Sequence, residues 1–451
     1  MDKTAGAKIV LLFDDYARDS KRLHTSFKLA NIGCDVVVIN EDGFLPDDVN
    51  SVYEYFLDDF VQYDTYLGRP RYFNQIEMPR FWEIKANMSK GNIYDFNKEK
   101  ARIYFIDSSD NKRRVKVVEW LDDNGAVRLS DHYNRYGVLY ARTSFSAKGE
   151  RVNKIYYSSK MQPVIYENYT TGSVMLNYQN KERLFSSKAD FVTYYMKLRG
   201  YERSRIYFNS LWHSFFVSER LSSDSKDDIL FWQEDKRDDI PGNMKIILDG
   251  KASRTQVIVA QKRDAYEKLI ELGASPAFIK LKGFIYPFER ENEGRAKVLI
   301  ATNSDQIEHI EDIIKAMPEV DFNIVAITAM SAKLLELEAY ENASLYPGVE
   351  TEVLDDLFKE CDMLLDINNY NEICDAVYRS FLNNMVILAF DSTKHNGAYT
   401  ADESIYNKDN WEQMVSDIRK IFADKSELSR RLDLQKKKGL AETEKSYALL
   451  K

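Results

Sequence analysis

Glycine, proline and cysteine are scarce in this chain of 451 residues, with 18, 9 and 3 residues respectively. This scarcity, together with 44% hydrophobic residues, excludes a collagen-like chain and a disordered Pro/Gly-rich chain. Cys34, Cys361 and Cys374 are too few and too widely spaced for a disulfide framework or a zinc site. No apolar run approaches the roughly 18 residues of a membrane span. The short apolar run near the start leads into acidic residues, unlike a signal peptide.

The glycines are also far apart along the chain. The two nearest, Gly242 and Gly250, are separated by eight positions, so no GxG, GxGxxG or GxxxxGK[ST] motif occurs. Phosphate-binding loops need closely spaced glycines because their backbone must approach the anion. A P-loop and a dinucleotide site are therefore excluded, whereas a sugar-nucleotide site held by arginine and lysine side chains stays open. HExxH and GxSxG are absent too, and we expect neither a cofactor nor a metal.

Charge is unevenly distributed in a chain whose net charge is −9. The acidic balance argues against a general nucleic-acid binder, because neutralising phosphates requires a basic field. Residues 1–60 contain 12 acids and 6 bases, whereas the tail from Arg419 contains 10 bases and 5 acids. The tail either contacts an anionic partner or membrane, or forms the solvated face of a helix. We expect a cytoplasmic protein, with attachment to the inner face of the cell membrane as one role of this tail.

The order of predicted elements divides the chain into parts. Residues 1–50 read as a βαβ unit that starts with the apolar run Lys8–Phe13. Residues 186–290, which include a predicted strand at Lys245–Leu248, return to helices and strands and complete a first Rossmann-like domain. Residues 291–451 alternate strands and helices, which is typical of a second doubly wound sheet, here followed by a tail helix. The predicted fold class is α/β with two Rossmann-like domains.

Residues 51–185 differ from the rest of the chain. Their short alternating strands are separated by turns, of which those at Gly125, Gly137 and Gly149 are 12 residues apart. This spacing predicts an antiparallel β-sheet domain, a meander inserted in the first Rossmann-like domain. Fifteen of the 29 tyrosines fall in this range. Because tyrosine suits half-buried strands and interfaces, we expect the inserted sheet to be an assembly surface.

Polar residues follow the strands whose carboxyl ends we expect to face a cleft between the two halves. Asn303 or Ser304 either caps a helix predicted over Asp305–Ala316 or binds a ligand. Glu372 either stabilises the start of a helix predicted over Glu372–Phe381 or binds hydroxyl groups. Trp232, Gln233 and Glu234 end another buried strand, where they would add a stacking face. The candidate ligand-binding residues are Trp232, Gln233, Glu234, Asn303, Ser304, Asp305, Asn368, Asn371, Glu372, Asp391 and His395.

Several unusual sequence strings are similar to those of one known family. The chain resembles the GtfB family, the stabilising, acceptor-binding and non-catalytic subunits of the protein O-GlcNAc transferase of the accessory Sec system. The similar strings follow the same order over nearly the whole chain. They are Asn40–Pro46 (NEDGFLP), Tyr72–Ile84 (YFNQIEMPRFWEI), Val118–Arg142 (VEWLDDNGAVRLSDHYNRYGVLYAR), Asp228–Gly250 (DILFWQEDKRDDIPGNMKIILDG), Thr302–Glu308 (TNSDQIE), Leu364–Ile373 (LLDINNYNEI) and Leu388–His395 (LAFDSTKH).

The resemblance implies a glycosyltransferase-B fold with an inserted β-domain. It also implies a catalytic partner of the GtfA type, in a two-plus-two heterotetramer whose contacts involve the inserted β-domains. The partner would transfer N-acetylglucosamine from UDP-GlcNAc to Ser/Thr of serine-rich repeat adhesins before export. This chain would bind the adhesin polypeptide in its own cleft and stabilise the partner.

The chain departs from active relatives of that family at two places. They carry two cleft acids about eight positions apart and a basic pair for the diphosphate. Here Glu372 lies near the first acid's place, but Ser380 occupies the second. No basic residue follows Thr302 before Lys315. Both departures indicate a chain that does not transfer sugar by itself. One alternative is a UDP-sugar-dependent glycosyltransferase that is active in its own right. Another is a scaffold that binds its partner through the β-sheet and has a vestigial cleft.

Overall fold

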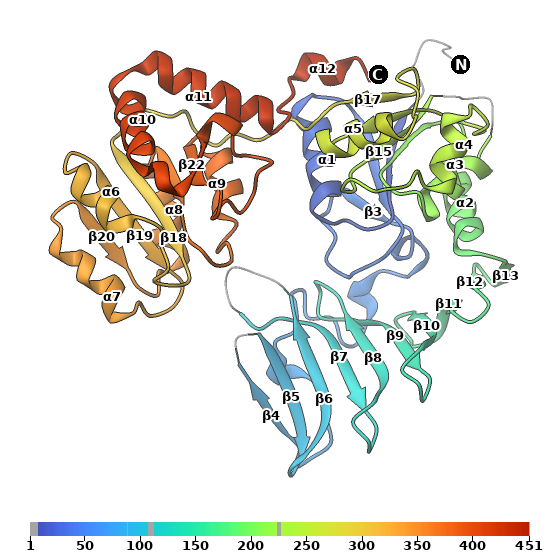
Figure 1. Ribbon diagram of the computed structural model, residues 1–451. Helices are drawn as coiled ribbons and strands as arrows, with labels where there is room; N and C mark the ends of the chain where they lie inside the picture. The colour runs from blue at the N-terminus through green and yellow to red at the C-terminus, as the bar shows by residue number, and fades with distance from the viewer. Residues whose placement is uncertain (1–7, 88, 107–111, 223–226, 451) are drawn as a thin grey trace. The chain divides into compact units, whose positions relative to one another are not determined.

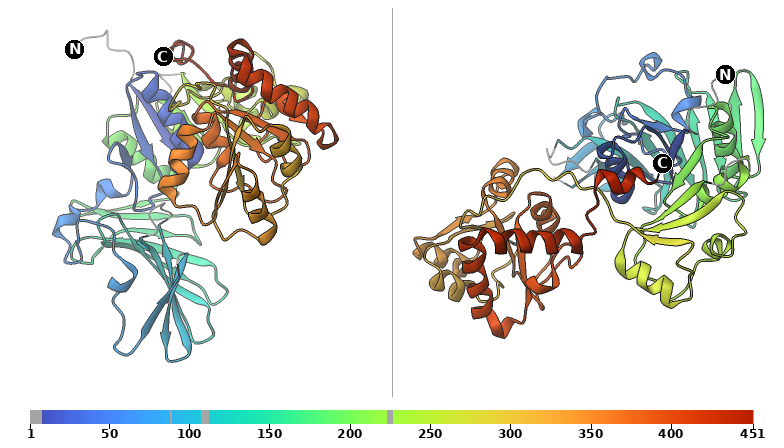
Figure 2. Two further views of the ribbon diagram at one scale, coloured as in Figure 1. Left: turned by 90° about the vertical axis from the view of Figure 1, so that its left-hand side faces the viewer. Right: turned by 90° about the horizontal axis from the view of Figure 1, so that it is seen from above.

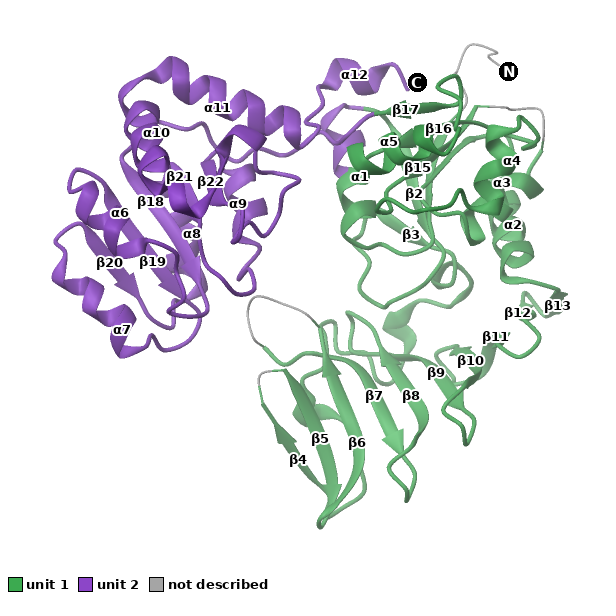
Figure 3. Cartoon of the chain, viewed as in Figure 1, with its two compact units in different colours: residues 1–24, 32–281 green, residues 25–31, 282–451 purple. Residues whose placement is uncertain are grey.

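The computed structural model describes residues 8–87, 89–106, 112–222 and 227–450. The first seven residues, on which the expectation of no signal peptide partly rests, lie outside this part of the chain. Two compact units are present, residues 1–24 with 32–281 and residues 25–31 with 282–451 (Figure 3). Each unit contains one parallel sheet and is described by itself below. No helix of the described residues is long and apolar enough to cross a membrane.

The parallel sheet of the first unit has seven strands in the order β3-β2-β1-β14-β15-β16-β17 (Figure 1). The order reverses between β1 and β14, so their carboxyl ends mark the topological switch point. All five residues of β1 are buried, as expected for a central strand of a sheet covered on both faces. The strands are β1 (Ile9–Phe13), β2 (Cys34–Val38), β3 (Val49–Ser51), β14 (Arg205–Phe208), β15 (Asp228–Trp232), β16 (Thr255–Ala260) and β17 (Ile279–Leu281); the helices are α1 (Arg18–Leu29), α2 (Lys188–Leu198), α3 (His213–Arg220), α4 (Gly242–Leu248) and α5 (Arg263–Glu271).

Between β3 and α2 the chain forms a ten-stranded antiparallel sheet in which strands adjacent in sequence are adjacent in space (Figures 1 and 2). Gly125, Gly137 and Gly149 lie in its turns with φ of +79°, +76° and +79°, a conformation that glycine adopts without strain. Three 3₁₀ helices precede the sheet: η1 (Glu54–Phe56), η2 (Phe60–Gln62) and η3 (Phe73–Gln75). The strands are β4 (Glu83–Ala86), β5 (Lys90–Asp95), β6 (Lys98–Phe105), β7 (Val115–Leu121), β8 (Val127–Tyr133), β9 (Leu139–Phe145), β10 (Arg151–Tyr157), β11 (Pro163–Asn168), β12 (Val174–Tyr178) and β13 (Lys181–Phe185).

Strands β9 to β12 pack one of their faces on the parallel part of the first unit. Tyr156, Ile165 and Leu176 from these strands join the same buried cluster as Phe191 of α2. The ring of Tyr53 stacks on that of Tyr156 with centroids 4.4 Å apart. The predicted fold class is therefore confirmed: an α/β chain with two Rossmann-like sheets and an antiparallel sheet inserted in the first.

The parallel sheet of the second unit has six strands in the order β20-β19-β18-β21-β22-β23, with its switch point between β18 and β21. The basic tail from Arg419 forms the end of α10 (Trp411–Ala423), α11 (Lys425–Lys438) and α12 (Glu444–Ala448), and Leu428 and Leu432 are buried in the core of this unit. The strands are β18 (Lys297–Thr302), β19 (Asp321–Ala326), β20 (Ala343–Tyr346), β21 (Met363–Asp366), β22 (Val386–Phe390) and β23 (Ile405–Tyr406); the helices are α6 (Ile310–Ala316), α7 (Ala332–Leu335), α8 (Thr351–Glu360), α9 (Ala376–Leu382), α10 (Trp411–Ala423), α11 (Lys425–Lys438) and α12 (Glu444–Ala448), with 3₁₀ helices η4 (Glu336–Ala339), η5 (Asp402–Ser404) and η6 (Lys408–Asn410).

Three element predictions are wrong, and two of them alter the candidate site. The segment Lys245–Leu248 belongs to α4 and is not a strand, because a short apolar run does not separate a strand from a buried helix. The helix predicted from Asp305 begins only at Ile310. The helix predicted from Glu372 begins at Ala376. The loops after β18 and β21 are therefore longer than predicted.

Candidate functional site

Asn368 is the hub of the polar groups at the carboxyl edge of the second sheet. It follows β21 and is 1% exposed. Its side-chain oxygen accepts hydrogen bonds from the hydroxyls of Thr302 at 3.0 Å and Ser304 at 3.3 Å. Its amide nitrogen donates to the carbonyls of Tyr370 and Asn371, both at 3.3 Å. The switch point thus fixes the two loops to each other through short polar side chains, as expected where parallel strands end.

The half-buried His395 and the buried Asp366 form a charged pair beside this hub. Asp366 ends β21, and one of its carboxylate oxygens accepts from the backbone N–H of His395 at 2.9 Å. Nδ1 of His395 donates to the other oxygen, and Nε2 donates to the carbonyl of Tyr370. Two acceptors require both ring nitrogens to carry protons. The hydrogen bond that His395 donates to Asp366 raises the pKa of His395 to about 9, so the ring is an imidazolium at neutral pH.

Glu372 stabilises the start of a helix, as one of the two alternatives predicted. Its carboxylate accepts from the backbone N–H of Val377 in the first turn of α9 at 2.8 Å. Burial, followed by the nearby charges of Asp366 and Asp375, raises the pKa of Glu372. The half-buried carboxylate of Glu372 therefore already has a structural partner, and its binding of a ligand stays a prediction.

The remaining predicted residues of this edge lie at its rim. Asn303, Asn371 and Asp391 are exposed. Asp305 accepts from Ser331 at 3.0 Å, which holds the first loop against the start of α7. The prediction that Asn303 or Ser304 caps the following helix is wrong. That helix, α6, begins after His309 in a left-handed conformation with φ of 51°, and no side chain caps it.

The carboxyl edge of the first sheet carries a second polar network, centred on Gln233. Its side chain accepts from Asn209 at 2.7 Å and donates to Gln261 at 2.7 Å. Each of these three residues directly follows a strand: β14, β15 and β16. Glu234 is exposed beyond the network and pairs with Arg237 at 3.3 Å.

Trp232 does not provide the predicted stacking face. It is 2% exposed and belongs to the buried core of the first unit. Every residue inside a parallel strand covered on both faces is buried, so only residues beyond the strand reach the edge. Trp212 lies just before α3, is 65% exposed, and donates from Nε1 to His213 at 2.9 Å. The sequence signal that would have found it is its place four residues after the strand β14.

Asp14 is the second residue that the sequence prediction missed. It directly follows β1 at the switch point and is 7% exposed. Its carboxylate accepts from the hydroxyl of Ser210 at 2.7 Å and from the backbone N–H of Ser214 at 2.9 Å. Asp14 therefore fixes the loop that carries Trp212. The rule that placed Asn303 and Asn368 at an edge would also have placed Asp14 there.

The carboxyl edge of the second sheet offers mainly hydroxyl, amide and carboxylate groups beside the imidazolium of His395. The three loops that follow β18, β21 and β22, residues 303–309, 367–375 and 391–400, contain one lysine, Lys394, and no arginine. Within the described ranges, no three His, Cys, Asp or Glu side chains are grouped closely enough to hold a metal ion. Such edges suit a ligand that is rich in hydroxyls and peptide groups.

Profiles of four family domains match the chain in order. They are the GtfB N-terminal domain at residues 10–56, the GtfB middle domain at 82–186, the GtfB third domain at 188–272 and the GftB/GlyA-F C-terminal domain at 298–435. Two similar curated proteins are UDP-N-acetylglucosamine–peptide N-acetylglucosaminyltransferase stabilizing proteins GtfB. That of Streptococcus agalactiae is 38% identical over 97% of this chain and 98% of its own length. That of Streptococcus gordonii is 38% identical over 95% and 94%.

A crystal structure of a GtfA/B complex bound to UDP and GlcNAc contains a chain that superposes with a TM-score of 0.88 at 36% identity, covering 97% of this chain and 98% of that one. TarM is similar in fold alone, at 12% identity and a TM-score of 0.52. The relatives are named for stabilising a transferase, which agrees with the expectation of a non-catalytic subunit. The chain belongs to the GtfB family of stabilising proteins of peptide N-acetylglucosaminyltransferases.

Proposed function

We propose that this chain binds the acceptor polypeptide of a protein O-GlcNAc transferase and stabilises the catalytic, GtfA-type subunit. The acceptor would be a serine-rich repeat adhesin that receives GlcNAc from UDP-GlcNAc on Ser/Thr in the cytoplasm, before export. The observation that carries the acceptor role is the polar edge of the second sheet, where Asn303, Asn371 and Asp391 are exposed around the Asn368 hub.

A serine-rich repeat is extended, weakly apolar and dense in hydroxyls and peptide groups. Its recognition calls for short donors and acceptors held in place, since groups that are already ordered lose little entropy on binding. The bonds of Asn368 to both loops provide that order at the second sheet.

The stabilising role rests on the outward face of the inserted sheet. Ile155, Tyr166, Met175 and Leu184 lie directly opposite one another on β10, β11, β12 and β13, and we call this row the outer stripe. Ile155 and Tyr166 are half-buried, Met175 is 39% exposed and Leu184 is 75% exposed. Contiguous exposed apolar side chains mark interaction surfaces. We assign the outer stripe to the catalytic subunit, in a two-plus-two heterotetramer.

One assay tests the proposal. Purified chain, purified catalytic partner and their mixture are each incubated with a serine-rich repeat peptide and UDP-GlcNAc, and GlcNAc incorporation is measured by mass spectrometry. We expect incorporation at full rate only in the mixture, and binding of the unmodified peptide by this chain alone. Transfer of GlcNAc by the isolated chain would refute the non-catalytic role. Absence of peptide binding would refute the acceptor role and favour a scaffold that only binds the catalytic partner.

Alanine substitutions separate the edge from the rest of the surface. Asn303→Ala, Asn371→Ala and Asp391→Ala combined should weaken peptide binding at least about tenfold, equivalent to 1.4 kcal/mol. The control Asp433→Ala removes an exposed carboxylate on α11 and should change nothing. Unchanged affinity in the triple variant, measured by fluorescence anisotropy, would move the acceptor site elsewhere.

A further inference from the structure

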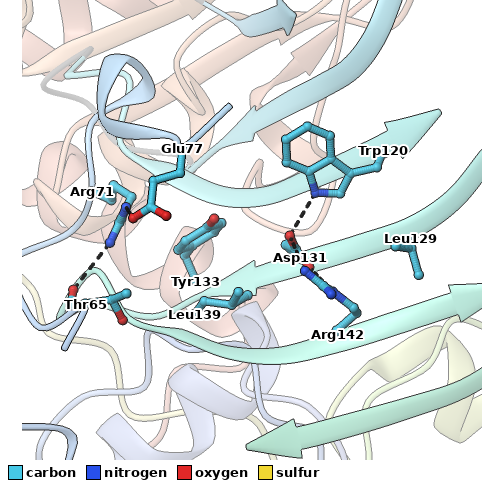
Figure 4. Close-up of a pocket in the computed structure, with 9 residues that line it drawn as sticks. All are labelled: Thr65, Arg71, Glu77, Trp120, Leu129, Asp131, Tyr133, Leu139 and Arg142. Atoms are coloured by element: carbon cyan, nitrogen blue, oxygen red, sulfur yellow. Dashed lines mark hydrogen bonds and ion pairs between the residues drawn. The ribbon is translucent and has the colours of Figure 1, made fainter. Parts of the chain in front are cut away.

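A small cavity opens on the inserted sheet, on the same face as the outer stripe. Its volume is about 300 Å³, and its walls come from β7, β8, β9 and the segment between η2 and β4 (Figure 4). Trp120, Tyr133 and Leu139 provide apolar walls, while Asp131 and Arg142 lie along one side. Cavities of this size, with apolar walls and few fixed polar groups, suit a small ligand or one protruding side chain.

Arg142 is held in position by a buried carboxylate that accepts three hydrogen bonds. Asp131 is 3% exposed. It accepts from Arg142 Nε at 2.6 Å and Nη2 at 3.0 Å, and from Trp120 Nε1 at 2.8 Å. This two-bonded geometry orders the guanidinium, whose side chain remains 36% exposed. Arg142 therefore reaches the cavity with Nη1 unused by any described residue.

The charges around the cavity do not balance inside it. Asp131 neutralises Arg142, but Arg71 is 6% exposed and donates to backbone carbonyls, including that of Gln75 at 2.9 Å. Its nearest carboxylate is Glu77 at 3.8 Å, whose side chain is 86% exposed. A solvated, loosely placed carboxylate adds little to binding and exchanges easily for another anion. Without the exposed Glu77, the other charged groups of the lining, Arg71, Arg142 and Asp131, carry one positive charge in excess.

The cavity and the outer stripe are parts of one continuous row. Asp131 lies opposite Arg142, Arg142 opposite Ile155, and the row continues through the stripe to Leu184. Strands are about 4.8 Å apart, so Arg142 and Leu184 are separated by four spacings, or about 19 Å. The cavity therefore adjoins the Ile155 end of the stripe, within reach of a protein seated there.

We propose that the cavity receives an acidic side chain, aspartate or glutamate, of the protein that docks on the outer stripe. The carboxylate bonds to Nη1 of Arg142, its methylene groups pack on Trp120 and Tyr133, and it replaces Glu77 near Arg71. The inference rests on the proposed docking of the catalytic subunit. It adds a requirement on the partner surface: an aspartate or glutamate that lies about 19 Å or less from an apolar side chain of the partner.

The test measures binding of the full-length chain to its catalytic partner by biolayer interferometry at 50, 150 and 500 mM NaCl. Glu77→Gln removes the competing carboxylate from an exposed position and should tighten binding about threefold or more. Arg142→Lys keeps the charge but loses the planar fork, and should raise the dissociation rate about tenfold. Leu184→Ser, which alters only the stripe, should weaken binding without changing its salt dependence.

A second measurement uses the unmodified chain, so its result does not depend on whether the Arg142 variant folds. Phenylglyoxal labels exposed arginines, and mass spectrometry follows Arg142 in the free chain and in the complex. We expect labelling of Arg142 to fall at least about fivefold on complex formation, while Arg419, whose side chain is 52% exposed on α10, stays reactive. If Leu184→Ser loses binding while Glu77→Gln binds as the unmodified chain does and Arg142 is not protected, the partner docks on the outer stripe but places no acidic side chain in the cavity. No binding by the unmodified chain overturns the proposed docking itself.

Discussion

At the scale of single residues, His395 has a charge that its neighbours fix. Its two ring N–H groups donate to Asp366 and to the carbonyl of Tyr370, and its pKa is raised to about 9. The charged ring should persist well above the ordinary pKa of 6.5. Its contribution to stability is complete below pH 6.5 and is lost as the pH rises through about 9. Titration of the ring protons by NMR should give a midpoint near pH 9.

Two comparisons make this titration decisive. Asp366→Asn should lower the pKa of His395 towards 6.5, because the carboxylate is the largest cause of the shift. His132 is an internal contrast, since burial lowers its pKa to about 2 and its ring should not titrate between pH 5 and 10. A midpoint of His395 near 6.5 in the unmodified chain would contradict the ion pair.

The sequence predicted where polar residues would gather, but not which side chains would face outwards. Asn303, Asn368 and His395 lie at one edge because they follow three neighbouring parallel strands, β18, β21 and β22, whose carboxyl ends meet there. Trp232 was the wrong tryptophan because burial inside a strand depends on the helices packed over it. Trp212 was missed because its exposure depends on the loop that Asp14 holds.

At the scale of elements, the loop after β2 is fixed to the inserted sheet by a close approach at Gly43. Its φ is +82°, and a Cβ would lie 2.8 Å from the carbonyl oxygen of Tyr133 and 3.0 Å from Cα of Asn134. Gly43→Ala should therefore destabilise the chain by about 2–4 kcal/mol, through a backbone clash added to the left-handed conformation. Urea denaturation followed by circular dichroism measures the loss.

A second glycine separates these two causes. Gly125 has φ of +79°, and a Cβ added there would have no other atom within 4 Å. Gly125→Ala should thus lose only the conformational part, about 1 kcal/mol. Equal losses in the two variants would show that the clash at Gly43 relaxes without cost, and that the loop does not fix the sheet.

Element boundaries were less predictable than element types. The predicted first strand, the apolar run Lys8–Phe13, agrees with β1 to within one residue because buried parallel strands are short apolar runs between polar loops. The predicted starts of α6 and α9 were several residues too early, since polar loop residues resemble capping residues. The run Lys245–Leu248 was assigned to a strand because its helical turn is too short to show a period of 3.6 residues.

At the scale of the whole molecule, the inserted sheet and the parallel sheet share a junction rich in carboxylates. Burial, then Glu41, raises the pKa of Glu54 to about 7. The pKa of Glu41 is itself raised by burial, and its Oε2 accepts no hydrogen bond from any described residue. Protonation of Glu54 therefore favours the folded chain, so this stability is complete below about pH 4.5 and is lost as the pH rises through about 7.

Glu54→Gln isolates this effect. The amide stays neutral, so the melting temperature of the variant should fall less between pH 5 and pH 8 than that of the unmodified chain. Glu83→Gln alters an exposed carboxylate with a 57% exposed side chain and serves as the control. Differential scanning fluorimetry in matched ionic strength measures the difference. Identical pH profiles for Glu54→Gln and the unmodified chain would show that the junction carries no such penalty.

The outer stripe links the stability of the whole molecule to its proposed assembly. A partner that binds only the folded chain stabilises it by RT ln(1 + [L]/Kd), or about 2.7 kcal/mol at a partner concentration of 100 Kd. The melting temperature of the chain should therefore rise with the concentration of its catalytic partner. Leu184→Ser should raise Kd and shift that curve to higher partner concentrations. Because Leu184 is 75% exposed on the edge strand β13, the same change should leave the isolated chain's own melting temperature within about 1 °C, as surface substitutions usually do. If the melting temperature does not depend on the partner concentration, the outer stripe does not bind the partner, and the stabilising role belongs to another part of the chain.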